Sequence, residues 1–295
     1  MNRKLEQQFL SKVKDKIILV TGASSGIGLT VAHKLADAGA HVLLVARTQE
    51  TLEQVQAEIE QRGGKASIFP CDLNDMESID RVAKDILASV DHIDILINNA
   101  GRSIRRAVHE SIDRFHDFER TMQLNYFGAV RLVLNVLPHM MQRKDGQIIN
   151  ISSIGVLANA TRFSAYVASK AALDAFSRCL SAEVHSHNIA ITSVYMPLVR
   201  TPMIAPTKIY NYVPTLSPEQ AADLIAYAIV KRPKKIATNL GRLASITYAI
   251  APDVNNILMS IGFNLFPSST ASVGKQEKLN LVQRAYARLF PGEHW

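Results

Sequence analysis

Short apolar runs alternate with longer amphipathic stretches from residue 17 to about residue 200. Six runs have the length and the Ile/Val/Leu content of buried strands: residues 17–21, 41–46, 66–70, 94–98, 147–152 and 190–195. Residues 235–238 form a seventh candidate, after a helix that begins at the capping pattern of Ser217. This alternation predicts βαβ units, and hence a three-layer, doubly wound α/β fold around a parallel sheet of about seven strands.

The pattern changes beyond residue 240. Residues 243–266 are apolar but are interrupted by Pro252, Asp253 and two asparagines. A membrane-spanning helix needs about 20 largely apolar residues, so we expect paired amphipathic helices instead. We therefore divide the chain into a basic segment at 1–16, a main domain at 17–240 and a helical extension at 241–295. The pattern leaves open whether the extension packs on the core, lines an apolar cavity or touches a membrane.

Length and composition agree with one large domain. The chain has 295 residues, of which 47% are hydrophobic, enough for a well-buried core. The two cysteines, Cys71 and Cys179, lie far apart in sequence, so we expect neither a disulfide framework nor a metal site. Residues 1–16 carry charges throughout and lack an apolar core, which argues against a secretory signal. We therefore expect a cytoplasmic protein.

The positive charge gathers in the last third of the chain. Residues 200–295 hold eleven lysines and arginines against five acidic residues, within a net charge of +7. Such a distribution favours a polyanionic partner: nucleic acid, anionic lipid or a phosphorylated small molecule. An ordinary solvated surface explains it equally well, so charge alone does not choose.

The stretch "VTGASSGIG" joins the first predicted strand to the first helix. Gly22, Gly26 and Gly28 allow a tight turn there, and the backbone N–H groups at the helix start would face a pyrophosphate. This position indicates a dinucleotide site in the main domain. The site would comprise the three glycines together with Ser24, Ser25 and Ile27.

The end of the second strand bears on which dinucleotide is bound. Residues 40–49 contain no acid that would hold the ribose hydroxyls of NAD, and Arg47 follows the strand. A guanidinium matches a phosphate in charge and fork geometry. NADPH is therefore favoured over NADH, although an arginine here is also compatible with a plain surface role.

Further motifs follow in order: "CDL" at 71–73, "NNAG" at 98–101, "INISS" at 149–153 and "YVASK" at 166–170. Over residues 15–205 the chain resembles the short-chain dehydrogenase/reductase family, which implies a Rossmann fold. The resemblance assigns Asp72, Leu73, Asn99, Ala100 and Gly101 to the cofactor, and Ser153, Tyr166, Lys170 and Asn125 to catalysis, the last as a water-holding residue of a proton relay. Lys170 would also contact the nicotinamide ribose.

The pair Tyr166 and Lys170 has a physical rationale of its own. A free phenol loses its proton near pH 10, too high for ready exchange at neutral pH. Four residues on, Lys170 lies on the same helix face, where its charge would lower the pKa of the phenol. Tyr166 would then protonate a substrate oxygen to which Ser153 donates a hydrogen bond.

The chain departs from the family pattern after the sixth strand. Leu198 follows Pro197, where the family often has Pro-Gly. Pro197, Val199 and Thr201 would still meet the nicotinamide, but the backbone there is less free than with glycine. We therefore expect a substrate loop that differs from that of smaller relatives.

Two further stretches are distinctive: residues 101–135, which begin "GRSIRRAVHE", and the tail from "APDVNNILMS" at 251 to "LFPGEHW" at 295. With them, the chain over its full length resembles the long-chain fatty acyl-CoA reductases of wax-ester-forming bacteria. This resemblance implies NADPH-dependent reduction of a long-chain fatty acyl-CoA to fatty aldehyde and free CoA. It also implies a homo-oligomer, a dimer or tetramer, with no nucleic-acid partner. Because the substrate and the product are both oily, a peripheral contact with the inner membrane stays open as a further expectation.

Two other functions remain as alternatives. An alcohol dehydrogenase or ketoreductase acting on a hydrophobic carbonyl compound would use the same catalytic residues without CoA. A redox sensor that binds NADPH without turnover would have no need of the Ser–Tyr–Lys set. Within the acyl-CoA reading, the basic stretches at 102–106 and 231–235 would receive the CoA phosphates.

Overall fold

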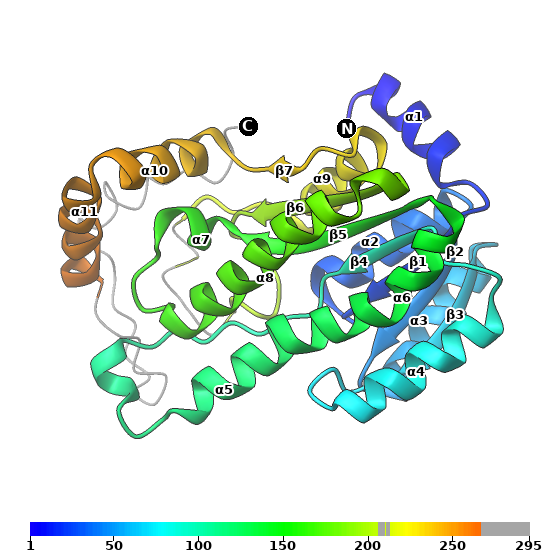
Figure 1. Cartoon of the computed structure of the whole chain (residues 1–295), viewed down its shortest axis with the longest axis horizontal. Coiled ribbons are helices and arrows are strands. Elements are labelled where there is room, and N and C mark those ends of the chain that lie inside the picture. The colour runs from blue at the N-terminus through cyan, green and yellow to red at the C-terminus, as the bar shows by residue number, and fades with distance from the viewer. Residues whose placement is uncertain (206–209, 211–212, 267–295) are drawn as a thin grey trace.

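Seven parallel strands form one sheet at the centre of the molecule (Figure 1). The computed structural model describes residues 1–205, 210 and 213–266. The strands are β1 (Ile17–Thr21), β2 (His41–Ala46), β3 (Lys65–Pro70), β4 (Ile95–Asn98), β5 (Gly146–Ser153), β6 (Ile189–Met196) and β7 (Lys235–Ile236). Each predicted strand is present, with ends that differ by no more than two residues. The predicted parallel α/β sheet is therefore confirmed.

The strand order is β3-β2-β1-β4-β5-β6-β7. β1 lies between β2 and β4, so that Leu19 is in register with Leu43 on one side and with Leu96 on the other. The chain reverses its direction of winding between β1 and β4. In open parallel sheets, ligands bind beyond the carboxyl ends of the strands at such a point.

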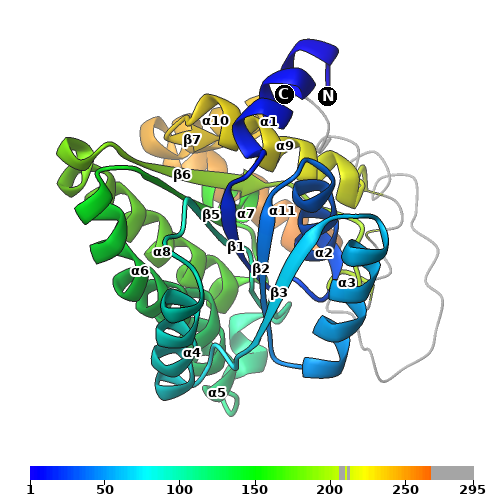
Figure 2. The same ribbon diagram turned by 90° about the vertical axis from the view of Figure 1, so that its right-hand side faces the viewer.

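Helices cover both faces of the sheet (Figure 2). One face carries α2 (Gly26–Asp37), α3 (Gln49–Gln61) and α9 (Pro218–Lys231), and the other carries α4 (Met76–Ser89), α6 (Ala129–Arg143) and α8 (Ser164–Glu183). Because side chains alternate along a strand, β1 sends Ile18 and Val20 into the first core and Leu19 into the second. Both faces are buried, which explains the continuous apolar runs.

The basic N-terminal segment contains a helix that the hydrophobic pattern did not predict. α1 (Arg3–Val13) is capped by the side chain of Asn2, which accepts a hydrogen bond from the Leu5 N–H at 2.9 Å. It packs on α9 and buries Phe9 and Val13 within the first core. Only these two side chains of α1 are buried, so the helical stripe was too narrow to recognise.

Shorter elements connect the layers. They are α5 (His116–Met122), α7 (Ile154–Ala158), the 3₁₀ turns η1 (Val108–Ser111) and η3 (His185–His187), and a π-helical turn, η2 (Gln123–Gly128). η2 continues directly from α5 into α6, and α5 packs on α8. The insertion of a π turn in a continuous helix places Asn125 in the protein interior.

The C-terminal extension begins with two helices, as expected. α10 (Asn239–Ile250) and α11 (Pro252–Leu265) pack on each other, and α10 packs on α7, where Gly241 meets Ile154 and Leu157. Residues 267–295, the rest of the expected extension, lie outside the described residues. Within the described part of the chain, no helix is long and apolar enough to cross a membrane.

Candidate functional site

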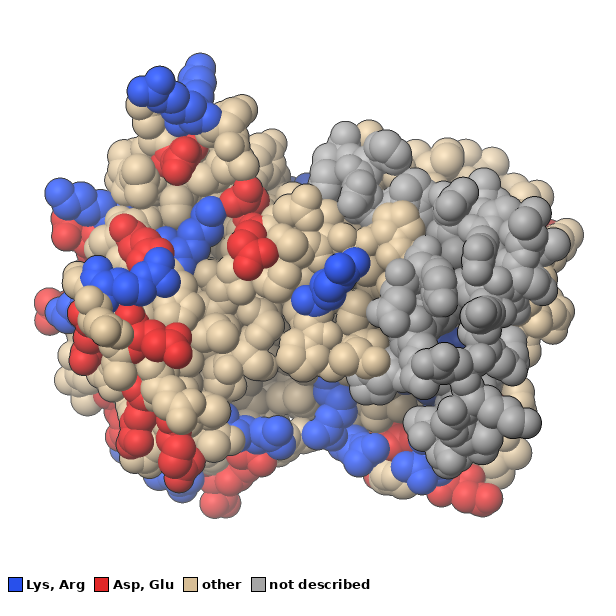
Figure 3. Space-filling view, turned by 180° about the vertical axis from the view of Figure 1, so that it is seen from behind, with Lys and Arg blue, Asp and Glu red and all other residues tan. Residues whose placement is uncertain are grey.

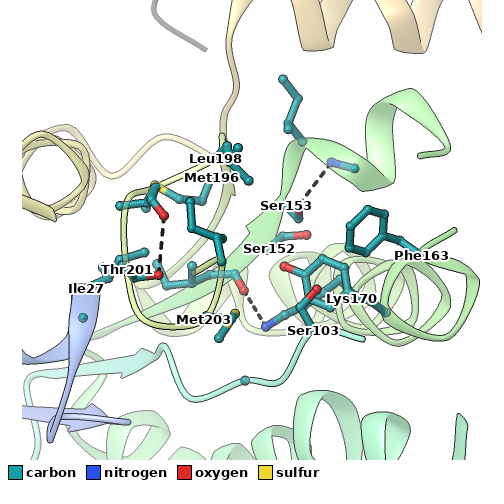
Figure 4. Close-up of a pocket in the computed structure, with 18 of the residues that line it drawn as sticks. Ile27, Ser103, Ser152, Ser153, Phe163, Lys170, Met196, Leu198, Thr201 and Met203 are labelled. Carbon is teal, nitrogen blue, oxygen red and sulfur yellow. Dashed lines mark hydrogen bonds between the residues drawn. The ribbon is translucent and has the colours of Figure 1, made fainter. Parts of the chain in front are cut away.

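A pocket of about 870 Å³ opens at the carboxyl edge of the sheet, between the segments that follow β1, β4, β5 and β6 (Figure 4). Many residues expected from the sequence line it: Gly22, Ser25, Gly26, Ile27, Asn99, Ala100, Gly101, Ser153, Tyr166, Lys170, Pro197, Val199 and Thr201. The remaining expected residues, Ser24, Gly28, Arg47, Asp72, Leu73 and Asn125, lie outside its lining. The fold thus joins motifs up to 179 residues apart in the sequence.

The glycine-rich turn has the geometry of a phosphate cradle. Gly22 and Gly26 have φ angles of +67° and +54°, which side chains disfavour. A Cβ at Gly28 would lie 2.1 Å from the carbonyl oxygen of Gly22, so only glycine fits there. Ser25 begins α2 without a side-chain cap, and no acidic residue lies in the first turn. The open, positive end of α2 therefore suits an anionic pyrophosphate.

Asn99 and Thr21 hold this turn against the end of β4. The Asn99 side-chain Nδ2 donates to the carbonyl of Thr21 at 3.0 Å, and the backbone N–H groups of Asn99 and Ala100 both donate to the Thr21 hydroxyl at 3.0 Å. These bonds join two strands that are distant in sequence. They keep the cradle and the "NNAG" segment in a single arrangement before any ligand binds.

Two arginines surround the aspartate that was expected near the adenine. Burial by itself raises the pKa of Asp72, but hydrogen bonds from Asn74 and the charges of Arg47 and Arg102 outweigh it and lower that pKa. Arg47 and Arg102 therefore lie close to the same carboxylate, at the ends of β2 and β4. Arg47 is exposed and Arg102 is half-buried, and an arginine pair at this position fits the extra phosphate of NADPH.

Tyr166, Lys170 and Ser153 meet at the deep end of the pocket. A hydrogen bond joins the Tyr166 phenol and the Ser153 hydroxyl, which also accepts from the Gly155 N–H at 3.1 Å. The Lys170 ammonium donates to the carbonyl of Ile151 at 2.8 Å, which ties α8 to β5. Three side chains from a strand end and one helix face thus surround one position that a substrate oxygen can occupy.

Burial, not the neighbouring cation, dominates the electrostatics of this site. Burial raises the pKa of Tyr166, and the hydrogen bond with Ser153 offsets only part of that rise. The net direction is opposite to the lowered phenol pKa expected from the sequence. Burial also lowers the pKa of Lys170 to about 8. Tyr166 is thus protonated at neutral pH and is suited to donate.

Asn125 lies behind the pocket wall, fully buried. Its Oδ1 accepts from the Arg102 N–H at 2.8 Å, and its Nδ2 donates to the Arg102 carbonyl at 2.9 Å and to the Ser169 hydroxyl at 2.9 Å. Ser169 in turn donates to the Tyr166 carbonyl at 2.7 Å. Asn125 therefore links the segment after β4 to the turn of α8 that carries Tyr166. Ser169 was missed in the sequence, although it lies within the "YVASK" motif.

The substrate end of the pocket contains residues that the sequence did not single out. They include Ser103, Arg105, Ile154, Phe163, Leu198, Met203, Ile204 and Tyr210. Tyr210 lies near Arg105 and Tyr166, and burial raises its pKa to about 12. These residues come from three connecting segments without a shared motif, so only the folded chain brings them together. Leu198 lines the pocket where the family often has glycine, as Figure 4 shows.

The two basic stretches have different positions. Arg105 and Arg106 line the pocket, and Arg106 also pairs with the buried Asp117 at 3.2 Å. In contrast, Lys231 bonds to Gln8 of α1 and Arg232 pairs with Asp145, which precedes the amino end of β5. The expectation that residues 231–235 receive the same ligand as residues 102–106 is therefore wrong. On the face in Figure 3, basic and acidic side chains of the described residues are interspersed.

Replacing Lys170 by methionine tests the cost of its burial. Because the pKa of Lys170 falls from 10.5 to about 8 on folding, the unfolded chain binds more protons than the native protein between these pH values. The free energy of unfolding contributed by Lys170 therefore rises with pH across this window. We expect the free energy of unfolding of the wild type to increase above pH 8 relative to that of Lys170→Met. Urea titrations of both proteins at pH 7, 8, 9 and 10 measure this difference. A difference that is independent of pH contradicts the burial effect.

Comparison with known proteins agrees with this geometry. The family model for short chain dehydrogenases matches residues 16–209. A fatty acyl-CoA reductase of Acinetobacter baylyi is 83% identical over 295 residues, 100% of both chains, and one of Mycobacterium tuberculosis is 46% identical over 245 residues, 83% of both. A crystal structure of a metagenomic short-chain oxidoreductase in complex with NADP is 29% identical, with a TM-score of 0.64, over 74% of this chain and 92% of that one. The chain therefore belongs to the short-chain dehydrogenase family.

Proposed function

We propose that this protein reduces long-chain fatty acyl-CoA to fatty aldehyde and free CoA with NADPH. The observation that carries the proposal is the 83% identity, over the whole of both chains, with the fatty acyl-CoA reductase of A. baylyi. Because the identity extends through the C-terminal extension, it covers more than the domain that all members of the family share. The overall change converts a thioester, NADPH and one proton into an aldehyde, CoA and NADP⁺.

The residues of the cleft fit NADPH. The open end of α2 and the turn from Gly22 to Gly28 suit the pyrophosphate, and Arg47 and Arg102 suit the 2′-phosphate. The similarity to a solved oxidoreductase in complex with NADP supports the same choice. When bound, NADPH supplies the hydride for the thioester carbonyl.

The catalytic residues serve the oxygen of that carbonyl. Ser153 donates a hydrogen bond to the oxygen as negative charge develops on it, and Tyr166 protonates it. The raised pKa of the phenol keeps this proton in place at neutral pH. The resulting hemithioacetal then loses CoA as the thiol and leaves the aldehyde. Lys170 holds α8 against β5 and provides positive charge beside the phenol.

No cysteine lies in the pocket, so the reaction proceeds without an acyl-enzyme thioester. Cys71 is buried after β3, accepts a hydrogen bond from Ser78 at 3.7 Å, and has its pKa raised by burial. Cys179 is exposed on α8, outside the pocket lining. Neither thiol is a nucleophile available to the substrate.

The setting of the enzyme forms a second part of the proposal. The aldehyde product would supply wax-ester synthesis. The enzyme would act as a homo-oligomer in the cytoplasm, in contact with the surface of the inner membrane. Support for a membrane contact comes from the exposed apolar side chains of α10 and α11, namely Leu243, Ile246, Ile250, Val254, Ile257, Leu258 and Ile261. An amphiphilic substrate and an oily product make such a contact useful.

NADPH oxidation by the purified protein tests the activity directly. We expect turnover with hexadecanoyl-CoA, release of one thiol per NADPH consumed, and formation of the aldehyde. In Tyr166→Phe, kcat falls roughly 100-fold or more, because the oxyanion loses its proton donor. Binding of NADPH, measured by fluorescence, stays close to that of the wild type.

A hydrophobic ketone serves as the parallel substrate in that assay. Turnover of the ketone without turnover of acyl-CoA would identify an alcohol dehydrogenase or ketoreductase. Full activity of Tyr166→Phe would show that another group donates the proton.

Replacing Cys179 by alanine tests the absence of covalent catalysis. We expect kcat with hexadecanoyl-CoA to stay within about twofold of the wild type, because the thiol lies outside the pocket. Complete loss of turnover in a variant that folds and binds NADPH normally would establish a thiol-dependent route instead.

Replacing Arg47 by leucine tests the choice of cofactor. The KM for NADPH should rise at least tenfold, because a charge-assisted hydrogen bond to the 2′-phosphate contributes on the order of 1.5–3 kcal/mol. The KM for NADH should change little. The exposed Arg62→Leu, at the far end of α3, is the matched control. An equal rise with both cofactors would count against Arg47 as a phosphate ligand.

A further inference from the structure

A second cavity lies beside the catalytic pocket, below α11. Its volume is about 370 Å³, and it is lined by Ala107, Val108, His109, Asn159, Ala160, Thr161, Arg162, Ser164, Val167 and Phe263. Most of the surface that faces the cavity is apolar. We call it the α11 groove. No residue of the expected catalytic or cofactor set lines it.

The α11 groove and the catalytic pocket share part of their walls. Ala160 and Val167 line both. Two segments contribute residues to the walls of both cavities: residues 103–110 after β4, and residues 159–167 before and within α8. The groove therefore adjoins the catalytic pocket, on the side of α11, whose place in the fold Figure 1 shows.

Gly155 places this shared wall close to the catalytic oxygen. A Cβ built on Gly155 would lie 3.3 Å from the Ser153 hydroxyl, 3.6 Å from the Ala160 Cβ and 3.6 Å from a methyl group of Val167. Gly155 therefore lies between the catalytic serine and both shared residues, within van der Waals range of each.

Phe263 of α11 forms the floor of the groove, and Arg162 holds it there. The Arg162 guanidinium lies 4.0 Å from the centre of the Phe263 ring and donates to the carbonyls of Phe263 and Phe266 at 3.1 and 3.0 Å. The ring of His109 meets Phe263 edge-on at 6.3 Å. The backbone carbonyl of Arg162 accepts a hydrogen bond from the Arg106 N–H at 2.7 Å, so Arg162 also anchors the segment that forms the other wall.

We infer that the α11 groove binds the distal part of the acyl chain of the substrate, which enters past Gly155, Ala160 and Val167. This inference rests on the proposed reduction of acyl-CoA and names the part of the molecule that selects long chains. The apolar groove suits methylene groups, whose burial strengthens binding by about fourfold each.

Enlarging the shared wall tests the inference. In Val167→Phe and in Ala160→Leu, the added atoms narrow the passage into the groove. We expect kcat/KM for hexadecanoyl-CoA to fall at least tenfold more than kcat/KM for butanoyl-CoA, whose short chain stays on the catalytic side of the wall. Most of this change should appear in KM, because the catalytic oxygen position is unaltered. Phe263→Ala deepens the floor and should shift the preference towards longer chains.

Val254→Phe is the matched control, because Val254 is exposed on α11 and lies outside the groove. It should leave the ratio of the two substrates as in the wild type. If both wall variants lower the two substrates alike, or leave hexadecanoyl-CoA unaffected, the groove does not hold the acyl chain. Failure of the wild type to reduce any acyl-CoA would instead reject the proposed function itself.

Discussion

The parallel arrangement of the sheet is the constraint on which the site depends. Because all seven strands run in one direction, the segments that follow β1, β4, β5 and β6 emerge at one edge. The reversal between β1 and β4 opens that edge to a ligand. Hydrogen bonds from Asn99 and Ala100 to Thr21 then bind the two sides of the opening together. Arg47 and Asp72, proposed for the cofactor, follow β2 and β3 at the same edge of the sheet.

Burial determines how the catalytic pair behaves. The sequence placed a phenol and an ammonium on one helix face, and attraction between opposite charges then predicted a phenol that ionises more easily. In the folded protein both groups lie inside, and loss of water opposes charge on each of them. The result is a phenol that keeps its proton at neutral pH beside a lysine whose pKa is lowered to about 8. That is the state needed for donation to an oxyanion.

The C-terminal extension connects the catalytic core to the surface. α10 packs on α7, next to Ser153, and the Arg162 clamp holds the end of α11 against the segment that leads into Tyr166. Through Phe263, the extension forms part of the wall of the α11 groove. Other apolar side chains of α10 and α11 are exposed.

The sequence by itself determined the sheet and the ordered motifs that carry the candidate catalytic set, because each depends on local spacing: apolar runs of strand length, glycines at a strand end, and Tyr166 four residues before Lys170. The position of Arg47 after β2 likewise predicted a ligand for the 2′-phosphate of NADPH. The tertiary structure alone decided the burial that sets the two pKa values, the packing of α1 through Phe9 and Val13, and the distance of residues 231–235 from the pocket. It also decided the α11 groove, whose walls come from three separate segments. These features depend on contacts between residues far apart in the chain, and no local pattern specifies which distant surfaces will meet.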